Sequence, residues 1–162
     1  MKVAATRERG TELCLHGVLA GLFFVHGLIT MASGMGAVAD GGRKAWTEPG
    51  LANAAWLSWW PINLGRSWII DAAQIGPPGY ALGELIWLAS GLAFVGAGLG
   101  LFGVPGLQPV WRILALAGGG FGVTAVALFF HPWYALALLI NLAVLVTRAG
   151  TERSPLTVVA GA

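Results

Sequence analysis

Four long stretches of the chain are hydrophobic and contain at most one charged residue each. They cover residues 12–33, 79–103, 110–130 and 133–147. About 20 helical residues, at a rise of 1.5 Å each, cross a hydrocarbon core of roughly 30 Å. The fourth stretch is shorter and needs tilt or local thinning of the bilayer to span it. The pattern predicts an all-α integral membrane four-helix bundle.

Residues 34–78 interrupt this pattern, because they contain most of the mid-chain charges and five of the eight tryptophans. Residues 51–60 and 64–74 can form short helices separated at Pro61. Tryptophan-rich, moderately polar helices are typical of the membrane surface, where the indole ring contacts both phases. The segment is therefore a long Trp-rich extracytoplasmic loop carrying short interfacial helices, or a packed surface loop with aromatic anchors. Polar tails are expected at residues 1–11 and 148–162.

Composition agrees with a membrane protein and excludes several functions. Hydrophobic residues make up 57% of the chain and charged residues 10%, whereas soluble domains carry about 25% charged residues. The mean hydropathy is +0.76. A net charge of +2, without a basic stripe, argues against a nucleic-acid partner. The single cysteine, Cys14, excludes an internal disulfide.

The distribution of lysine and arginine predicts the orientation of the spans. With the N-terminus inside, six basic residues lie on the cytoplasmic side and three on the other. We therefore expect a multi-pass protein of the cell inner (plasma) membrane, with both termini in the cytoplasm. Ala37-Val38-Ala39 resembles a signal-peptidase site, but the preceding apolar stretch is too long for a usual signal peptide. We interpret it as a retained first span.

Glycines at a spacing of four residues recur in the first three spans. In lipid, close packing at small residues drives helix association, since burial of apolar surface cannot. Such pairs can pack the helices of the bundle against one another, or they can mediate self-association or contact with other membrane subunits. The lipid bilayer is the other expected partner. The three pairs are Gly17 and Gly21, Gly96 and Gly100, and Gly118 and Gly122.

Polar residues inside a span are costly, and they carry a functional hypothesis by default. The orientation places His26 in the outer part of the first span, Glu84 roughly 6 Å below the outer start of the second, and His131 at the outer hairpin. We expect these three residues to form a polar site in the outer half of the bundle. Glu84 and a histidine there could relay protons, bind a quinone carbonyl or contribute to a metal site. The alternative is a purely structural Glu–His pair.

The sequence does not identify a cofactor. His16 and His26 are offset by about 80° around a helix, so they do not share a face for haem ligation. The chain contains no HExxH, GxSxG or P-loop motif. Haem is therefore not expected, a quinone is one candidate ligand, and the cofactor and any catalytic residue stay unknown. No resident metal is predicted.

The first two spans resemble the DoxX-like family of small four-helix bacterial membrane proteins. The resemblance rests on Val25-His26-Gly27 at the end of an apolar run and on Gly83-Glu84 before a glycine-rich helix. The long first loop also fits. This chain has Leu13-Cys14-Leu15 where the family often has an arginine. The resemblance implies quinone-linked or redox-accessory work.

Three functions follow as hypotheses. The first is an accessory membrane subunit of a redox or quinone-linked system, without proven catalysis of its own. The second is a non-catalytic structural or lipid-binding subunit of a larger membrane complex. The third is a small transporter, for which four spans without inverted repeats or broken helices offer little gating machinery.

Overall fold

A computed structural model describes residues 2–38 and 53–151, with side chains placed for residues 14–36 and 53–147. This part of the chain is predominantly helical and has no strand. Its α-helices are α1 (Lys2–Ser33), α3 (Trp68–Ala72), α4 (Pro77–Leu101), α5 (Trp111–Leu128) and α6 (Ala135–Thr151). A π-helix (Gly34–Val38) continues α1, and 3₁₀ turns cover Ala55–Leu57, Gln108–Val110 and Pro132–Tyr134.

Three of these helical segments are long and apolar enough to cross a membrane, which supports the prediction of a helical membrane protein. They are Cys14–Gly36, Pro77–Leu101 and Gln108–Leu128, and Pro132–Thr147 is a shorter apolar helix. The α1 helix begins at Lys2, so the expected N-terminal tail is helical and continuous with the first span. Its alanines, arginines and glutamate favour helix. Trp46, part of the expected 51–60 helix and residues 152–162 lie outside the described residues.

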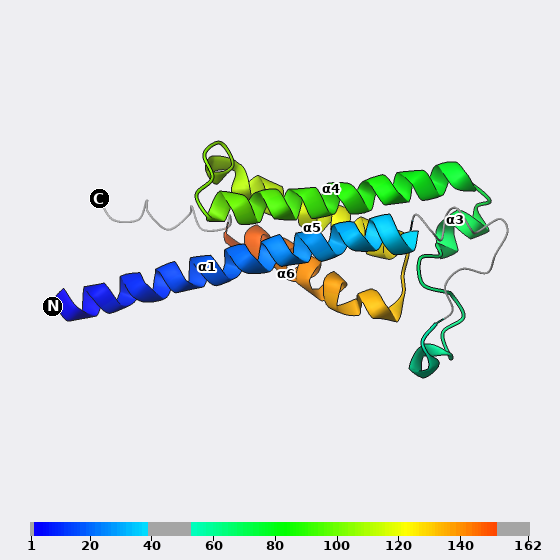
Figure 1. Cartoon of the computed structure of the whole chain (residues 1–162), viewed down its shortest axis with the longest axis horizontal. Helices are drawn as coiled ribbons and strands as arrows, with labels where there is room; N and C mark the ends of the chain where they lie inside the picture. The colour runs from blue at the N-terminus through cyan, green and yellow to red at the C-terminus, as the bar shows by residue number, and fades with distance from the viewer. Residues whose placement is uncertain (1, 39–52, 152–162) are drawn as a thin grey trace, which may run out of the picture.

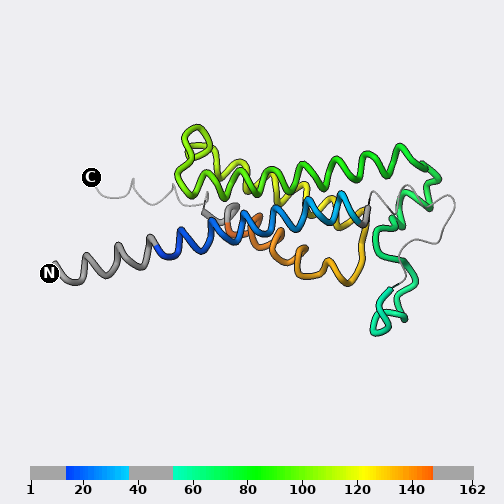
Figure 2. The backbone as a smooth tube through the Cα atoms, viewed as in Figure 1, coloured from blue at the N-terminus to red at the C-terminus, as the bar shows by residue number. Residues whose placement is uncertain are grey.

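The helices are packed in chain order: α1 lies on α4, α4 on α5, and α5 on α6 (Figure 1). The tube in Figure 2 shows α1 and α4 running side by side over most of the length of α4. This order leaves α1 and α6 as the outer members of the arrangement. Figure 1 also shows α3 at the same end of the structure as the start of α4, which we call the loop end.

Glycines bring α1 and α4 into backbone contact. A Cβ atom on Gly27 would lie 2.7 Å from the Gly91 carbonyl oxygen and 2.8 Å from the Val95 nitrogen. On Gly98 it would lie 2.8 Å from the Ala20 oxygen. Only a residue without a side chain allows this approach, which maximises van der Waals packing in lipid.

The six glycines of the predicted pairs differ in what they pack against. Gly118 packs beneath the Phe94 ring, Gly122 against the Asn141 side chain, and Gly100 against Trp111. A Cβ atom on Gly96 would lie 3.1 Å from the Leu114 side chain. A Cβ atom on Gly17 or Gly21 would have no atom of the other described residues within 4 Å.

The loop is held by tertiary hydrogen bonds. Within residues 53–76, the helical segments are the turn Ala55–Leu57 and the five-residue α3, which is less helix than expected there. The Ser67 hydroxyl donates to the Leu128 carbonyl at 2.6 Å, and the Trp68 indole donates to the Ala127 carbonyl at 2.9 Å. These bonds satisfy two carbonyls at the end of α5, which have no intrahelical partner.

Candidate functional site

The centre of the candidate site is a buried histidine–asparagine pair that joins α1 to α6. The Nε2–H of His26 donates to the Oδ1 of Asn141 at 3.0 Å. The two residues are 7% and 1% exposed. Because the carboxamide oxygen only accepts, Nε2 carries a proton in this bond. Burial favours the neutral form of the ring, in which Nδ1 is the acceptor nitrogen.

The surrounding helices shape this pair. The His26 ring meets Phe94 of α4 edge-on, with the ring centroids 4.8 Å apart. Gly122 of α5 lacks a side chain where the Asn141 carboxamide lies, so Asn141 fits between α5 and α6. One turn further along α1, the buried Thr30 hydroxyl donates to the His26 carbonyl at 2.8 Å. All four principal helices therefore contribute to the position of the pair.

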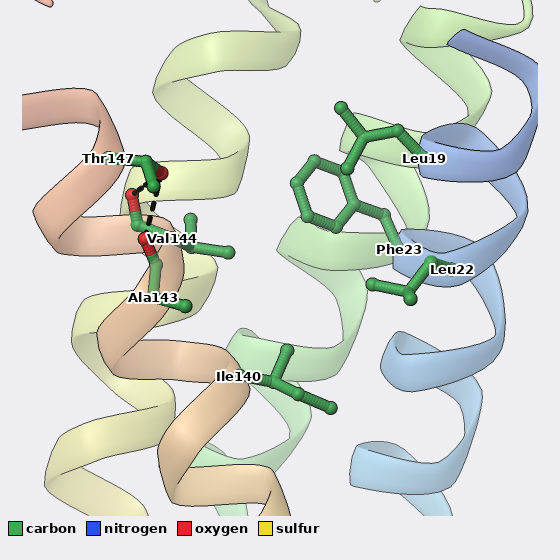
Figure 3. A pocket seen from close by; sticks show the side chains of 7 residues that line it. All are labelled: Leu19, Leu22, Phe23, Ile140, Ala143, Val144 and Thr147. Atoms are coloured by element: carbon green, nitrogen blue, oxygen red, sulfur yellow. Dashed lines mark hydrogen bonds between the residues drawn. The ribbon is translucent and has the colours of Figure 1, made fainter. Parts of the chain in front are cut away.

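A groove of about 300 Å³ opens between α1 and α6. Figure 3 shows Leu19 and Phe23 projecting from α1 toward Ile140 and Val144 on α6. The hydroxyl of Thr147 is bonded to carbonyls of its own helix, at 2.7 and 3.2 Å, so the groove is apolar. It adjoins the polar pair at a distance of one helical turn, since Phe23 precedes His26 by three residues and Val144 follows Asn141 by three; neither member of the pair lines the groove. The lining is completed by Leu22 and Ala143.

His131 lies at the loop end and pairs with a residue of the loop. Its Nε2 is 2.9 Å from the Oδ1 of Asn53, and its Nδ1 accepts from the Trp133 backbone N–H. Asn53 in turn donates to the carbonyls of Trp60 and Ile62. Burial lowers the pKa of His131 below its usual 6.5, since the charged form is desolvated. His131 therefore anchors the loop as a neutral ring.

Glu84 is half-buried on α4, and no described side chain hydrogen-bonds to its carboxylate. Gly34 packs against Trp87 and lies level with Glu84. His26 precedes Gly34 by eight residues, or about 12 Å along the helix. The structure therefore places Glu84 and His131 at the loop end and His26 deeper, and it does not bring the three into one hydrogen-bonded site. His16 is exposed.

Two site residues had no predicted partner in the sequence. Asn141 stands out as a lone polar residue in an apolar run, but nothing in the sequence indicates that it meets His26. Asn53 carries no pattern at all, because it lies in an irregular segment. Within the described ranges, no cluster of three histidine, cysteine or acidic side chains could hold a metal.

Acidification is expected to loosen the loop. The folded state depresses the pKa of His131, so its contribution to stability is full above the unfolded pKa of about 6.5 and is lost as the pH falls from there through the folded pKa. The protection of loop amides against hydrogen exchange, after correction for the intrinsic pH dependence of exchange, should therefore fall between pH 7 and pH 5. The variant His131→Asn should show a weaker pH dependence over this range, and an identical dependence in both proteins would contradict the assignment.

Comparison of the chain with protein-family models, with curated proteins and with solved structures finds no match.

Proposed function

We propose that the chain is an accessory membrane subunit of a redox or quinone-linked system that binds a lipid-soluble ligand between α1 and α6. The observation that supports this proposal is the apolar groove adjoining the neutral His26–Asn141 pair. Binding sites for small molecules combine an apolar lining with a few polar groups that orient the ligand. The resemblance of the first two spans to the DoxX-like family supports a quinone as that ligand. No catalysis by this chain is part of the proposal.

The proposed topology has four spans in the cell inner membrane, with both termini in the cytoplasm. The fourth span is α6, whose 17 residues extend for about 26 Å and would cross with local thinning of the bilayer. The groove then lies in the cytoplasmic half of the bundle and opens to lipid. A quinone would insert its hydrophobic tail there, with its head toward His26 and Asn141. Glu84 and His131 would lie near the outer surface, away from the groove.

A second candidate function is a structural or lipid-binding subunit of a larger complex. The observation that favours it is the face of α1 at Gly17 and Gly21, which no described residue covers. A second helix can approach such a face closely. Native mass spectrometry combined with an absorbance spectrum separates the candidates. A co-purifying quinone supports the first, and a stoichiometric protein partner without quinone supports the second.

Filling the groove is expected to weaken quinone binding strongly. The variant Ala143→Trp places an indole among the lining residues, and the affinity for a short-chain ubiquinone in detergent should fall roughly tenfold or more. The matched control is Val146→Trp, because Val146 lies on the same helix, is 69% exposed and does not line the groove. Titration followed by quenching of tryptophan fluorescence measures both affinities. Equal affinities in the two variants would exclude the groove as the site.

A further inference from the structure

Three buried side-chain donors have no acceptor within the part of the chain that the structure describes, and two of them are neighbours. The neighbours are the indole Nε1–H of Trp87 on α4 and the hydroxyl of Tyr134 in the turn before α6; the third donor is the indole Nε1–H of Trp60 in the loop. The two neighbouring residues are only 1% and 4% exposed. Their rings are adjacent, with centroids 5.0 Å apart. Buried donors in native proteins nearly always find a partner, including ordered water, so these two require an explanation.

The described neighbours of the two donors do not supply an acceptor. Trp87 and Tyr134 belong to a cluster whose other buried members are Ile70, Tyr80, Ala125, Val126 and Phe129. Within this cluster the other polar side chain is Tyr80, and its hydroxyl already donates to Asp71 and accepts from the Ser67 backbone N–H. The His131 ring lies 6.2 Å from the Tyr134 ring, and both of its nitrogens are hydrogen-bonded to other groups. Gly34 lets the Trp87 side chain lie against the end of α1, which keeps its indole inside the bundle.

The charges around the donors favour a neutral acceptor. Glu84 precedes Trp87 by three residues on α4, a spacing that places both on adjoining parts of one helix surface. A carboxylate there repels an anion. Of the described cations, Arg66 is paired with Asp71 at 2.8 Å, and Arg112 lies at the opposite end of α5. No described positive charge is therefore available to hold an anionic ligand beside these donors.

We infer that Trp87 Nε1–H and Tyr134 O–H together bind one neutral accepting oxygen that the described part of the chain does not supply. An oxygen with two lone pairs accepts from both donors at once. Both a trapped water and the carbonyl group of a lipid-soluble molecule provide this chemistry. The site lies on the loop side of the His26–Asn141 pair, and it does not depend on the groove or on the proposed quinone.

Nuclear magnetic resonance of the indole N–H groups tests this inference on the full chain in detergent micelles. The Trp87 signal is assigned by its loss in Trp87→Phe. It is expected at the low-field position of a hydrogen-bonded indole and should move in Tyr134→Phe, which removes only one oxygen atom. The control is Trp133→Phe, because Trp133 is 59% exposed and its ring packs on Trp56 instead. This control should leave the Trp87 signal in place.

The source of the oxygen is distinguished by the cross-peak to water and by the addition of cyclohexanone. If it is water, the Trp87 N–H shows a cross-peak to water that cyclohexanone does not alter. If it is a carbonyl group, cyclohexanone shifts the Trp87 signal, and Tyr134→Phe weakens the apparent affinity for cyclohexanone roughly two- to tenfold. Either result supports the inference. A Trp87 signal at the position of a free indole, with no response to the ketone and no water cross-peak, would overturn it, as would a shift caused by acetate and not by the ketone.

Discussion

Replacing Gly91 by leucine is expected to abolish the folded arrangement of α1 and α4. A Cβ atom at this position would collide with the Met31 side chain, and it would lie 2.7 Å from the Gly27 carbonyl oxygen and 3.0 Å from the Met31 nitrogen. Two of these three neighbours are backbone atoms, which move only if the helices separate. Overpacking costs about 1–3 kcal/mol where a side chain can adjust. The larger leucine against backbone should exceed that range.

Unfolding by sodium dodecyl sulfate in mixed micelles, followed by circular dichroism, measures this loss of stability. The matched control is Gly17→Leu, because Gly17 also lies in a membrane helix and has no described atom within 4 Å of a built Cβ. We expect the control to unfold at nearly the wild-type detergent fraction. If both variants were equally stable, the close contact between α1 and α4 would not exist in the membrane protein.

The second large effect is expected at Asn141. The variant Asn141→Leu removes the acceptor of the His26 Nε2–H and leaves this donor buried without a partner, at a cost of roughly 1–3 kcal/mol. The tetrahedral Cγ of leucine is also thicker than the flat carboxamide that fits against Gly122. The same unfolding assay measures the loss. A double-mutant cycle with His26→Leu should give a coupling energy of about 1 kcal/mol, as is typical of hydrogen bonds between membrane helices.

Thr124→Val is the control for this second prediction. The Thr124 hydroxyl donates to the Gly120 carbonyl of its own helix at 2.9 Å and is exposed, so its removal leaves no buried donor unpaired. This variant should change stability by only a few tenths of a kcal/mol. Fully additive effects of His26→Leu and Asn141→Leu would show that the two side chains do not interact.

The long helices could be predicted from the sequence because lipid leaves the backbone few choices. In an apolar solvent every N–H and C=O must be bonded within the segment, so an uncharged apolar run of sufficient length forms a helix. The observed α4 begins two residues before its expected start at 79 and ends two before its expected end at 103. The break at His131-Pro132 also occurs as predicted, as an extended residue followed by a 3₁₀ turn.

The partners of the polar residues could not be predicted, because they depend on helix rotation and stagger. His26 and Asn141 are 115 residues apart in sequence, and His131 and Asn53 are 78 apart. The prediction that His26 and Glu84 lie at a common depth assumed that the first span ends at the level where the second begins. Helical structure continues past Ser33 as far as Val38, so Gly34 lies level with Glu84 and His26 lies deeper.

Ser67 and Trp68 of the loop complete the hydrogen bonding at the end of α5, although 61 and 59 residues separate them from their partners. Carbonyl groups that face hydrocarbon without a donor are costly. Exchanging residues 53–76 for a short flexible linker would leave these two carbonyls bare at the membrane boundary. Any shortened version of this protein therefore has to terminate α5 by another means, such as earlier unwinding or a donor from a neighbouring chain.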